Sequence, residues 1–187
     1  FTLYVRSQYG LPRVFAGRQY HMVEELPYGQ QMQADMGECY MTDVEGVRKK
    51  VYFFACVLAR SRYKFAVFQD YPLTTRDLVD AHEKAFAFID GYPEELVYDQ
   101  DKLMLVKENL GDLVLTDVFR AYQQTKPFRL HFCRKRDPES KGKVESVVKY
   151  IKYNFLRGRT FYDIHTLNHQ AVDWLSRTAN AKVHATT

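Results

Sequence analysis

The sequence predicts an α/β domain built on a mixed, five-stranded sheet with helices on its faces. Three strand-like runs follow one another through short connections, which favours an antiparallel meander. A helical segment then separates the third run from a fourth, and a crossover of this kind favours parallel pairing. Amphipathic helical patterns occupy most of the C-terminal part. Layered sheet and helices of this kind define an α/β architecture.

Size and composition are those of one folded domain. The chain has 187 residues, of which 46% are hydrophobic, 15% aromatic and 27% charged. This composition supplies a sizeable core and excludes a wholly disordered chain. No apolar run approaches the roughly 18 residues needed to cross a bilayer, and no signal peptide is visible. The three cysteines are odd in number and form no CxxC pair, which favours a reducing, cytoplasmic compartment over a disulfide framework or a zinc site.

The N-terminal part contains a lead-in and the expected meander. Residues 1–28 hold scattered Gly and Pro without a period, so they are predicted to be a linker or the remnant of a preceding domain, and residues 29–187 the folded core. Strands are expected at 31–42, 50–59 and 63–68. The second of these is almost continuously apolar, as in a strand buried on both faces.

The middle of the chain alternates between the two types of element. A helix is expected from Thr74 to about position 90, where Gly91 ends it. A fourth strand follows at 94–98 and a hairpin at 103–115. Thr116 is then expected to cap a helix that reaches position 125.

The C-terminal part is predicted to be helical apart from one more strand. A fifth core strand is expected at 128–133, with His131 and Cys133 packed in the core, and a polar loop at 134–143. An amphipathic helix follows at 144–156, and a final helix at 167–181. Two sets of apolar residues are expected to be buried where these helices pack on the rest of the domain. They are Val144, Val148, Ile151 and Phe155 in the first helix, and Leu167, Val172, Trp174 and Leu175 in the second.

Positive charge is concentrated in one segment. Residues 134–159 contain nine basic and three acidic side chains, whereas the whole chain carries a net charge of only +4. Such a stretch is typical either of a surface that binds a polyanion or of a solvated helix face.

Three carboxylates lie at positions that would suit a catalytic or ligand-binding role. Asp35 lies within the first strand, Asp99 ends the fourth strand, and Glu145 opens the 144–156 helix. Taken singly, each can be a solvent-facing, turn or ion-paired residue. Taken together, they can meet at one edge of the sheet, where ligands of α/β proteins bind. Three such carboxylates would repel one another unless hard divalent cations, Mg²⁺ or Mn²⁺, neutralise them, and two such ions can support phosphodiester displacement.

Several segments resemble the Asp-Asp-Glu core of the integrase and transposase superfamily, in particular the IstA-type insertion-sequence transposases. The three segments around the carboxylates are 33–38 (QADMGE), 98–101 (YDQD) and 141–150 (KGKVESVVKY). Segments 20–27 (YHMVEELP), 154–159 (NFLRGR) and 183–187 (VHATT) extend the resemblance over nearly the whole chain.

This resemblance implies an RNase H-like fold and divalent-metal-dependent joining of DNA strands. It implies Asp35, Asp99 and Glu145 as catalytic and metal-binding residues. As partners it implies DNA at the transposon ends and target, a homo-multimer and the AAA+ ATPase IstB, with no membrane. Because Asp101 follows so closely in the sequence, it remains an alternative to Asp99 as the second metal ligand.

Basic residues near Glu145 are the candidates for DNA contacts. At about 100° per residue, Lys141, Lys149 and Lys152 fall within roughly 40° of Glu145 around the helix axis. The candidate DNA-binding residues are Arg134, Arg136, Lys141, Lys143, Lys149 and Lys152. Two further functions stay open: a metal-dependent nuclease of the same fold, and a non-catalytic DNA-binding or assembly domain.

A pair of histidines is a weaker candidate for a metal site than the three carboxylates. His165 and His169 lie four residues apart in the sequence. No nearby Cys or carboxylate completes a tetrahedral ligand set, so a capping or surface role is expected for both.

Overall fold

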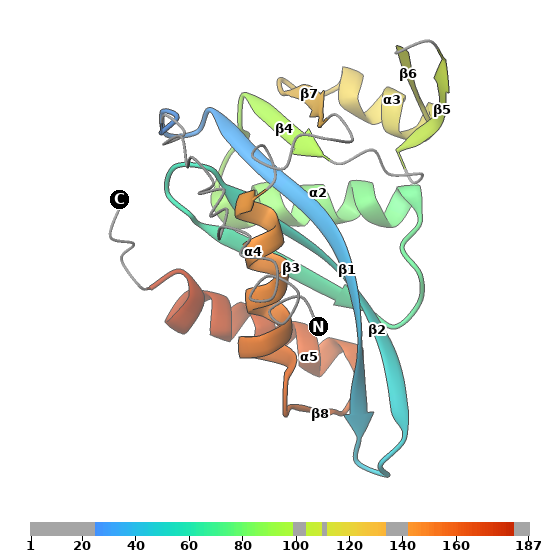
Figure 1. The fold of residues 1–187 in the computed structure, drawn as a ribbon, viewed down its shortest axis with the longest axis vertical. Helices are drawn as coiled ribbons and strands as arrows, with labels where there is room; N and C mark the ends of the chain where they lie inside the picture. The colour runs from blue at the N-terminus through green and yellow to red at the C-terminus, as the bar shows by residue number, and fades with distance from the viewer. Residues whose placement is uncertain (1–24, 99–103, 110–111, 134–141, 182–187) are drawn as a thin grey trace, which may run out of the picture.

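A mixed sheet with helices on both faces forms the molecule (Figure 1). The computed structural model describes residues 25–98, 104–109, 112–133 and 142–181. The strands are β1 (Gln31–Asp43), β2 (Arg48–Leu58), β3 (Lys64–Gln69), β4 (Glu95–Tyr98), β5 (Leu105–Asn109), β6 (Asp112–Leu115), β7 (Arg129–Phe132) and β8 (Thr160–Phe161). The helices are α2 (Thr75–Ile89), α3 (Asp117–Gln124), α4 (Gly142–Tyr150), η1 (Ile151–Leu156), α5 (Ile164–Trp174) and η2 (Leu175–Ala179), where η marks a π-helical segment.

The strand pairing confirms the predicted mixed sheet. The order is β3-β2-β1-β4-β7, in which the first three strands form the antiparallel meander and β4 and β7 run parallel to β1. The short strand β8, which the sequence patterns did not indicate, adds a sixth strand by pairing with the far end of β1. β5 and β6 form the predicted separate hairpin.

The two faces of β2 contact different helices, and these contacts show which helices cover each face of the sheet. Phe54 packs against His82 of α2, with ring centroids 5.0 Å apart. The neighbouring Phe53 points to the other face, where Lys152 of η1 lies over its ring. Successive side chains of a strand alternate between faces, so α2 with α3 covers one face and α4, η1 and α5 cover the other (Figure 1).

Local capping signals set the helix starts. Thr74 forms a capping box with Asp77 at the start of α2, and Thr116 accepts a hydrogen bond from the backbone N–H of Phe119 at the start of α3. The final helix begins at Ile164 and not at position 167, because the Asp163 side chain accepts from the N–H of Thr166. The prediction missed this start because it followed apolar spacing alone.

The 144–156 helix exists as two consecutive segments, α4 and η1. Val144, Ile151 and Phe155 are buried as predicted, and Val148 is half-buried. The prediction for Val172 in α5 was wrong, because its side chain is 45% exposed. None of the helices in the described ranges is long and apolar enough to cross a membrane.

The predicted fifth core strand was also wrong in one respect. β7 stands at the edge of the sheet, and its residues alternate between exposed and half-buried. His131 is therefore exposed and does not pack in the core, whereas Cys133, just beyond the strand, is buried as expected. Strand order, which apolar content does not encode, decided this outcome.

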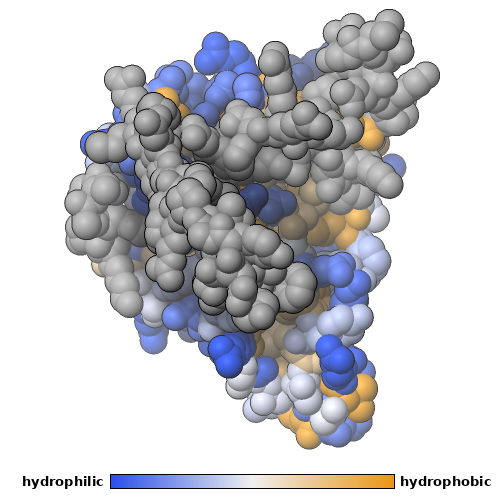
Figure 2. Space-filling view, viewed as in Figure 1, coloured by the Kyte–Doolittle hydropathy of each residue, from blue (hydrophilic) through white to orange (hydrophobic). Residues whose placement is uncertain are grey.

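The outer end of the β1–β2 hairpin projects beyond the helices. It forms the tapered lower end of the molecule in Figure 2, where hydrophilic and pale surfaces surround a small hydrophobic area. The core lies above it, between the sheet and the two helical layers.

Candidate active site

Asp35 lies on the face of β1 that α4 covers. Gln33, two positions earlier and therefore on the same face, contacts the first turn of α4. The Asp35 side chain is half-buried, and its Oδ1 accepts a 2.8 Å hydrogen bond from the backbone N–H of Met36. The carboxylate is thereby oriented by its own strand.

A buried glutamine fixes the start of α4 against this strand. Gln33 is 3% exposed, and its Oε1 accepts a 3.2 Å hydrogen bond from the backbone N–H of Val144. Its Nε2 donates to Gln31 at 3.3 Å, and Gln31 in turn donates to Glu95 of β4 at 3.0 Å. The first N–H groups of a helix have no partner within the helix. Gln33 therefore supplies an acceptor for one of these groups, the N–H of Val144, and so sets the position of Glu145, the residue after Val144.

Asp35 and Glu145 meet at a small pocket. The pocket has a volume of about 40 Å³ and lies between β1, the carboxyl end of β4 and the first turn of α4. That space accommodates a few water-sized species. Its lining residues are Gln33, Ala34, Asp35, Val97, Tyr98, Val144 and Glu145. Two carboxylates from segments far apart in the sequence are therefore brought to one edge, as predicted.

The third predicted carboxylate, Asp99, and its alternative Asp101 lie outside the described residues. Within the ranges that the structure describes, no three His, Cys, Asp or Glu side chains gather as a metal-binding group. The chemistry of the two pocket carboxylates nevertheless fits a hard divalent cation, which prefers oxygen ligands. Asp35 and Glu145 are the described residues able to hold it.

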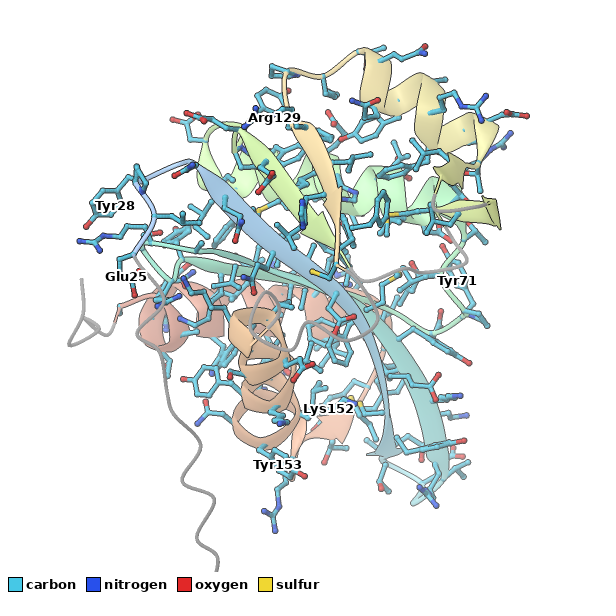
Figure 3. The ribbon with its side chains drawn as sticks, turned by 45° about the horizontal axis from the view of Figure 1, so that its top comes forward. Glu25, Tyr28, Tyr71, Arg129, Lys152 and Tyr153 are labelled. Carbon is cyan, nitrogen blue, oxygen red and sulfur yellow. The ribbon has the colours of Figure 1, made fainter. Side chains whose placement is uncertain are left out.

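A close contact beside Asp35 requires glycine. Gly37 follows Asp35 on the same face, and a Cβ at this position would lie 2.2 Å from Cζ of Phe53. The Phe53 ring therefore packs directly on the β1 backbone, and Lys152 Nζ lies 6.0 Å from the centre of that ring. Lys152 therefore lies over the sheet face that carries Asp35 (Figure 3).

The residues predicted to contact DNA differ in how exposed they are. Lys149 is exposed and Lys152 is half-buried. Lys143 is less exposed, at 22% of its side chain, and its Nζ donates to the carbonyl oxygen of Ala59 at 3.1 Å. Burial and the nearby positive charge of Arg62 hold the pKa of Lys143 below its ordinary value. The remaining candidates, Arg134, Arg136 and Lys141, lie outside the described residues.

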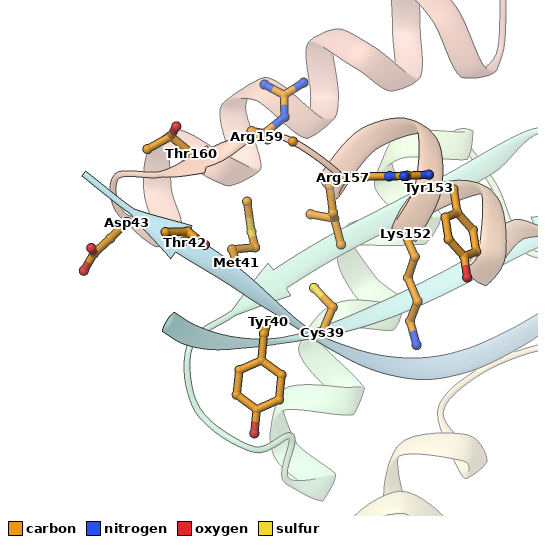
Figure 4. Close-up of a pocket in the computed structure, with 12 residues that line it drawn as sticks. Cys39, Tyr40, Met41, Thr42, Asp43, Lys152, Tyr153, Arg157, Arg159 and Thr160 are labelled. Atoms are coloured by element: carbon orange, nitrogen blue, oxygen red, sulfur yellow. The ribbon is translucent and has the colours of Figure 1, made fainter. Parts of the chain in front are cut away.

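A second cavity continues along the same face. It has a volume of about 430 Å³ and lies between the outer half of β1 and the turn from η1 to β8. In Figure 4, Cys39 and Met41 face it while Tyr40 points to the other side of β1. Lys152 and Arg157 line it together with Arg159, which donates hydrogen bonds to Phe155 O at 3.0 Å and Gln170 Oε1 at 2.7 Å. This basic wall extends from Lys152 of η1 to Arg159.

Sequence reasoning missed Gln33 as a positioning residue and the group formed by Glu25, Arg60 and Arg62. A glutamine between Met32 and Ala34 in an apolar strand is a usable signal, because buried polar side chains need partners. No sequence pattern connects Glu25 with two arginines of a later turn. For His165 and His169 the surface prediction is confirmed: both are exposed, and their ring centres lie 4.8 Å apart.

The fold is the RNase H-like fold of integrase catalytic cores. The HTLV-2 integrase catalytic core domain, solved in complex with magnesium, superposes with a TM-score of 0.60 at 14% identity, covering 88% of this chain and 95% of that one. The simian T-cell lymphotropic virus intasome, solved with the PP2A regulatory subunit B56 gamma, gives a TM-score of 0.62 at 15% identity, covering 89% and 55%. At these identities the likeness shows the fold.

Sequence relatives place the chain more narrowly. It is 49% identical to the transposase of an IS21-like insertion sequence from Bacteroides fragilis, over 98% of this chain and 36% of that protein. The IS21 transposase of Pseudomonas aeruginosa is 34% identical over 81% of this chain and 39% of that protein. No family model matches. The chain belongs to the IS21-type insertion-sequence transposases and spans a little over one third of the length of these two relatives.

Proposed function

We propose that this chain carries the active site for joining DNA strands, in which Asp35, Asp99 and Glu145 hold divalent metal ions. The observation that supports this proposal is the shared pocket of Asp35 and Glu145 beside the carboxyl end of β4. Carboxylates from distant segments that converge at this edge are typical of a site and not of a structural ion pair.

The strand register supports Asp99 as the third residue. Parallel pairing sets Gln33 of β1 beside Val97 of β4. In the sequence, Asp35 and Asp99 each follow these paired residues by two positions. This equal spacing supports Asp99 as the partner of Asp35. Asp101, two positions later again, is the alternative second ligand.

The metal is proposed to be Mg²⁺ or Mn²⁺. Integrase cores of the same fold have been solved with magnesium, and the pocket offers carboxylate oxygens. When bound, such ions activate a 3′-hydroxyl or water and stabilise the charge that develops on the phosphate. The chain's own residues orient the ligands: the N–H of Met36 holds Asp35, and Gln33 holds the helix that carries Glu145.

DNA binding is proposed for the same face. Lys149 and Lys152 follow Glu145 on one continuous helical stretch, and the basic wall of the larger cavity continues beyond them. By family membership we propose that the transposase works as a homo-multimer on transposon ends and target DNA, with IstB as its ATPase partner and at the nucleoid in the cytoplasm. Residues 29–187 are proposed as the core and residues 1–28 as its linker.

The decisive experiment compares carboxylate variants of the full-length transposase. Asp35→Asn, Asp99→Asn and Glu145→Gln should each lower strand joining at least about 1,000-fold, equivalent to about 4 kcal/mol of transition-state stabilisation. Their thermal unfolding should stay close to that of the parent. Glu38→Gln is the matched control, because Glu38 is exposed on the other face of β1 and pairs with Lys50 at 2.9 Å. Wild-type joining by all three variants would refute the assignment.

The same experiment separates the remaining alternatives. An inactive Asp101→Asn with an active Asp99→Asn would identify Asp101 as the second ligand. Cleaved but unjoined products would indicate a nuclease, since water and a 3′-hydroxyl use the same site. A non-catalytic domain would show no saturable Mn²⁺ binding that Asp35→Asn removes.

A further inference from the structure

Three cations surround one carboxylate at the corner where the β2–β3 turn meets the start of α4. Glu25 Oε1 lies 2.9 Å from Arg62 Nη2, and its Oε2 lies 3.8 Å from Arg60 Nη1 and 3.9 Å from Lys143 Nζ. Arg60 and Arg62 come from the turn, Lys143 from α4 and Glu25 from the segment before β1. Three chain segments that are not consecutive thus build this cluster, here called the corner cluster.

The fold, and not Glu25, holds two of the cations in place. Arg62 has a φ of +59° in the tight turn and donates from Nη1 to Ala59 O at 2.7 Å. Lys143 donates to the same carbonyl oxygen at 3.1 Å. Their side chains are only 18% and 22% exposed. Because their partner is a backbone carbonyl, the positions of these cations persist without the carboxylate.

Glu25 neutralises the corner cluster incompletely. One negative charge faces three positive charges. Glu25 Oε2 is buried, yet it has no hydrogen-bond partner among the described residues. The contacts at 3.8 and 3.9 Å are too long for hydrogen bonds. A phosphodiester presents two oxygens to guanidinium and ammonium groups and matches the fork of an arginine, so it suits this cluster at least as well as a carboxylate does.

An exposed aromatic beside the corner cluster favours a nucleotide over a simple anion. The Tyr28 ring is 68% exposed, and Cζ of Arg60 lies 5.5 Å from its centre. Aromatic rings next to cationic groups stack on bases of bound strands. Figure 3 shows Glu25 and Tyr28 at one corner of the molecule, away from Lys152 and Tyr153. Lys143 precedes Glu145 by two positions, so the cluster adjoins the active-site edge.

We propose that Arg60, Arg62 and Lys143 bind a phosphate of a DNA strand, and that Glu25 occupies this site as an intramolecular competitor when no DNA is present. This proposal rests on the proposed function in requiring DNA as a ligand, but it does not require catalysis. Binding of the strand then displaces Glu25 and breaks its contacts with the turn and with α4.

Removing the competitor gives the first test. Glu25→Gln in the full-length protein should tighten binding of a labelled DNA duplex about 3- to 10-fold at low salt, because the phosphate no longer displaces a charged side chain. Asp117→Asn removes the same charge from an exposed side chain of α3 and should change affinity less than about 2-fold. Equal gains in both variants would show a general charge effect and overturn the proposal.

Removing a cation gives the second test. Arg60→Gln should weaken binding and lower the slope of log affinity against log salt by about 1, whereas Arg120→Gln on α3 should not. In the Arg60→Gln background the gain from Glu25→Gln should shrink, because the two residues share one site. A gain that persists undiminished would overturn the proposal.

Two controls separate the corner cluster from the active site and from a site for free anions. All affinities are measured in EDTA and in the Asp35→Asn background, so a wrong active-site assignment leaves the result readable. Loss of joining in Asp35→Asn with no effect of Glu25→Gln would refute the corner cluster alone. Inorganic phosphate at millimolar concentration should not match DNA in stabilising Glu25→Gln against heat. Stabilisation by phosphate without any change in DNA affinity would identify a free-anion site and overturn the DNA assignment.

Discussion

The polar network on the α2–α3 face and the acidic pocket on the α4 face differ in how their titratable side chains are placed. On the α2–α3 face, polar groups are buried with partners: His82 is fully buried, its Nδ1 lies 2.6 Å from Leu78 O, and its Nε2 contacts the hydroxyl of Tyr98. Nearby, Glu83 accepts hydrogen bonds from the Tyr122 hydroxyl and from Lys126 Nζ. This arrangement satisfies each of these donors and acceptors within the fold.

At the acidic pocket of the α4 face, Asp35 and Glu145 come together instead, and Lys149 is exposed one turn further along α4. Two carboxylates at one pocket repel and do not stabilise the fold. A paired polar group thus contributes to stability, whereas like charges that converge at a pocket are typical of a ligand site. Substitutions in the polar network of the first face should therefore alter stability alone, and those around the pocket of the second face should alter DNA joining or DNA binding.

The largest expected effect concerns His82 and pH. Burial lowers the pKa of His82 from 6.5 to about 4. The unfolded chain therefore binds a proton between these values that the folded chain does not, so stability is full above about pH 6.5 and is lost as pH falls toward 4. The loss is about 3 kcal/mol.

Urea unfolding between pH 7 and pH 4 measures this dependence, and His82→Phe should flatten it. The titratable groups around the ring are Tyr98, which contacts it, Tyr122, whose ring centre lies 6.1 Å away, and Glu83, whose charge acts on it. An unchanged slope in His82→Phe would show that other groups cause the loss. Joining by the folded fraction should not change.

Gly37→Ala should come next. Its Cβ would overlap the Phe53 ring, and overpacking of this kind costs about 1–3 kcal/mol. Because Gly37 lies two residues from Asp35, joining should fall as well. Combining it with Phe53→Leu should recover part of the loss in thermal unfolding; strictly additive losses would argue against the contact.

Gln33→Met tests the connection between β1 and α4. It leaves the buried N–H of Val144 without its side-chain acceptor, which costs about 1–2 kcal/mol. Joining per folded molecule should fall roughly 10-fold, the equivalent of about 1.4 kcal/mol, because Glu145 loses its fixed position. Gln31→Met, which leaves the Val144 contact in place, is the control. Joining that matches the parent, despite lower stability, would make Gln33 a purely structural residue.

Tyr122→Phe tests the polar network on the first face. It removes the hydrogen bond to Glu83, whose side chain is 44% exposed. Solvent screening reduces the expected loss to about 1 kcal/mol. Chemical denaturation should show this loss while joining and DNA affinity stay at the parental level. A drop in DNA affinity would contradict the separation between the two faces.

The smallest stability effect is expected for Lys149→Gln, within about 0.5 kcal/mol. DNA affinity should nevertheless fall, and its salt slope should decrease by about 1. Lys84→Gln removes the same charge from an exposed position of α2 on the opposite face and should leave the slope unchanged. Equal slopes for both variants would argue against phosphate contact at Lys149.

Local sequence patterns were enough to predict most of the individual helices and strands. The meander, the helix starts at Thr74 and Thr116 and the hairpin at β5–β6 follow from apolar period, capping and turn residues. These signals act within a few residues, so they can be read without the fold. That Asp35 and Glu145 can meet at one edge of the sheet was likewise predicted from their positions on a strand and at a helix start. Their catalytic role came from the family resemblance and stays a prediction.

Which residues become neighbours depends on the three-dimensional packing of the elements. It placed β7 at the edge and so exposed His131, it set Gln33 against Val144, and it gathered Glu25, Arg60, Arg62 and Lys143 at one corner. These contacts join segments whose separation along the chain carries no periodic signal. Strand order and helix packing fix them, because burial and charge pairing depend on neighbours in space and not in sequence.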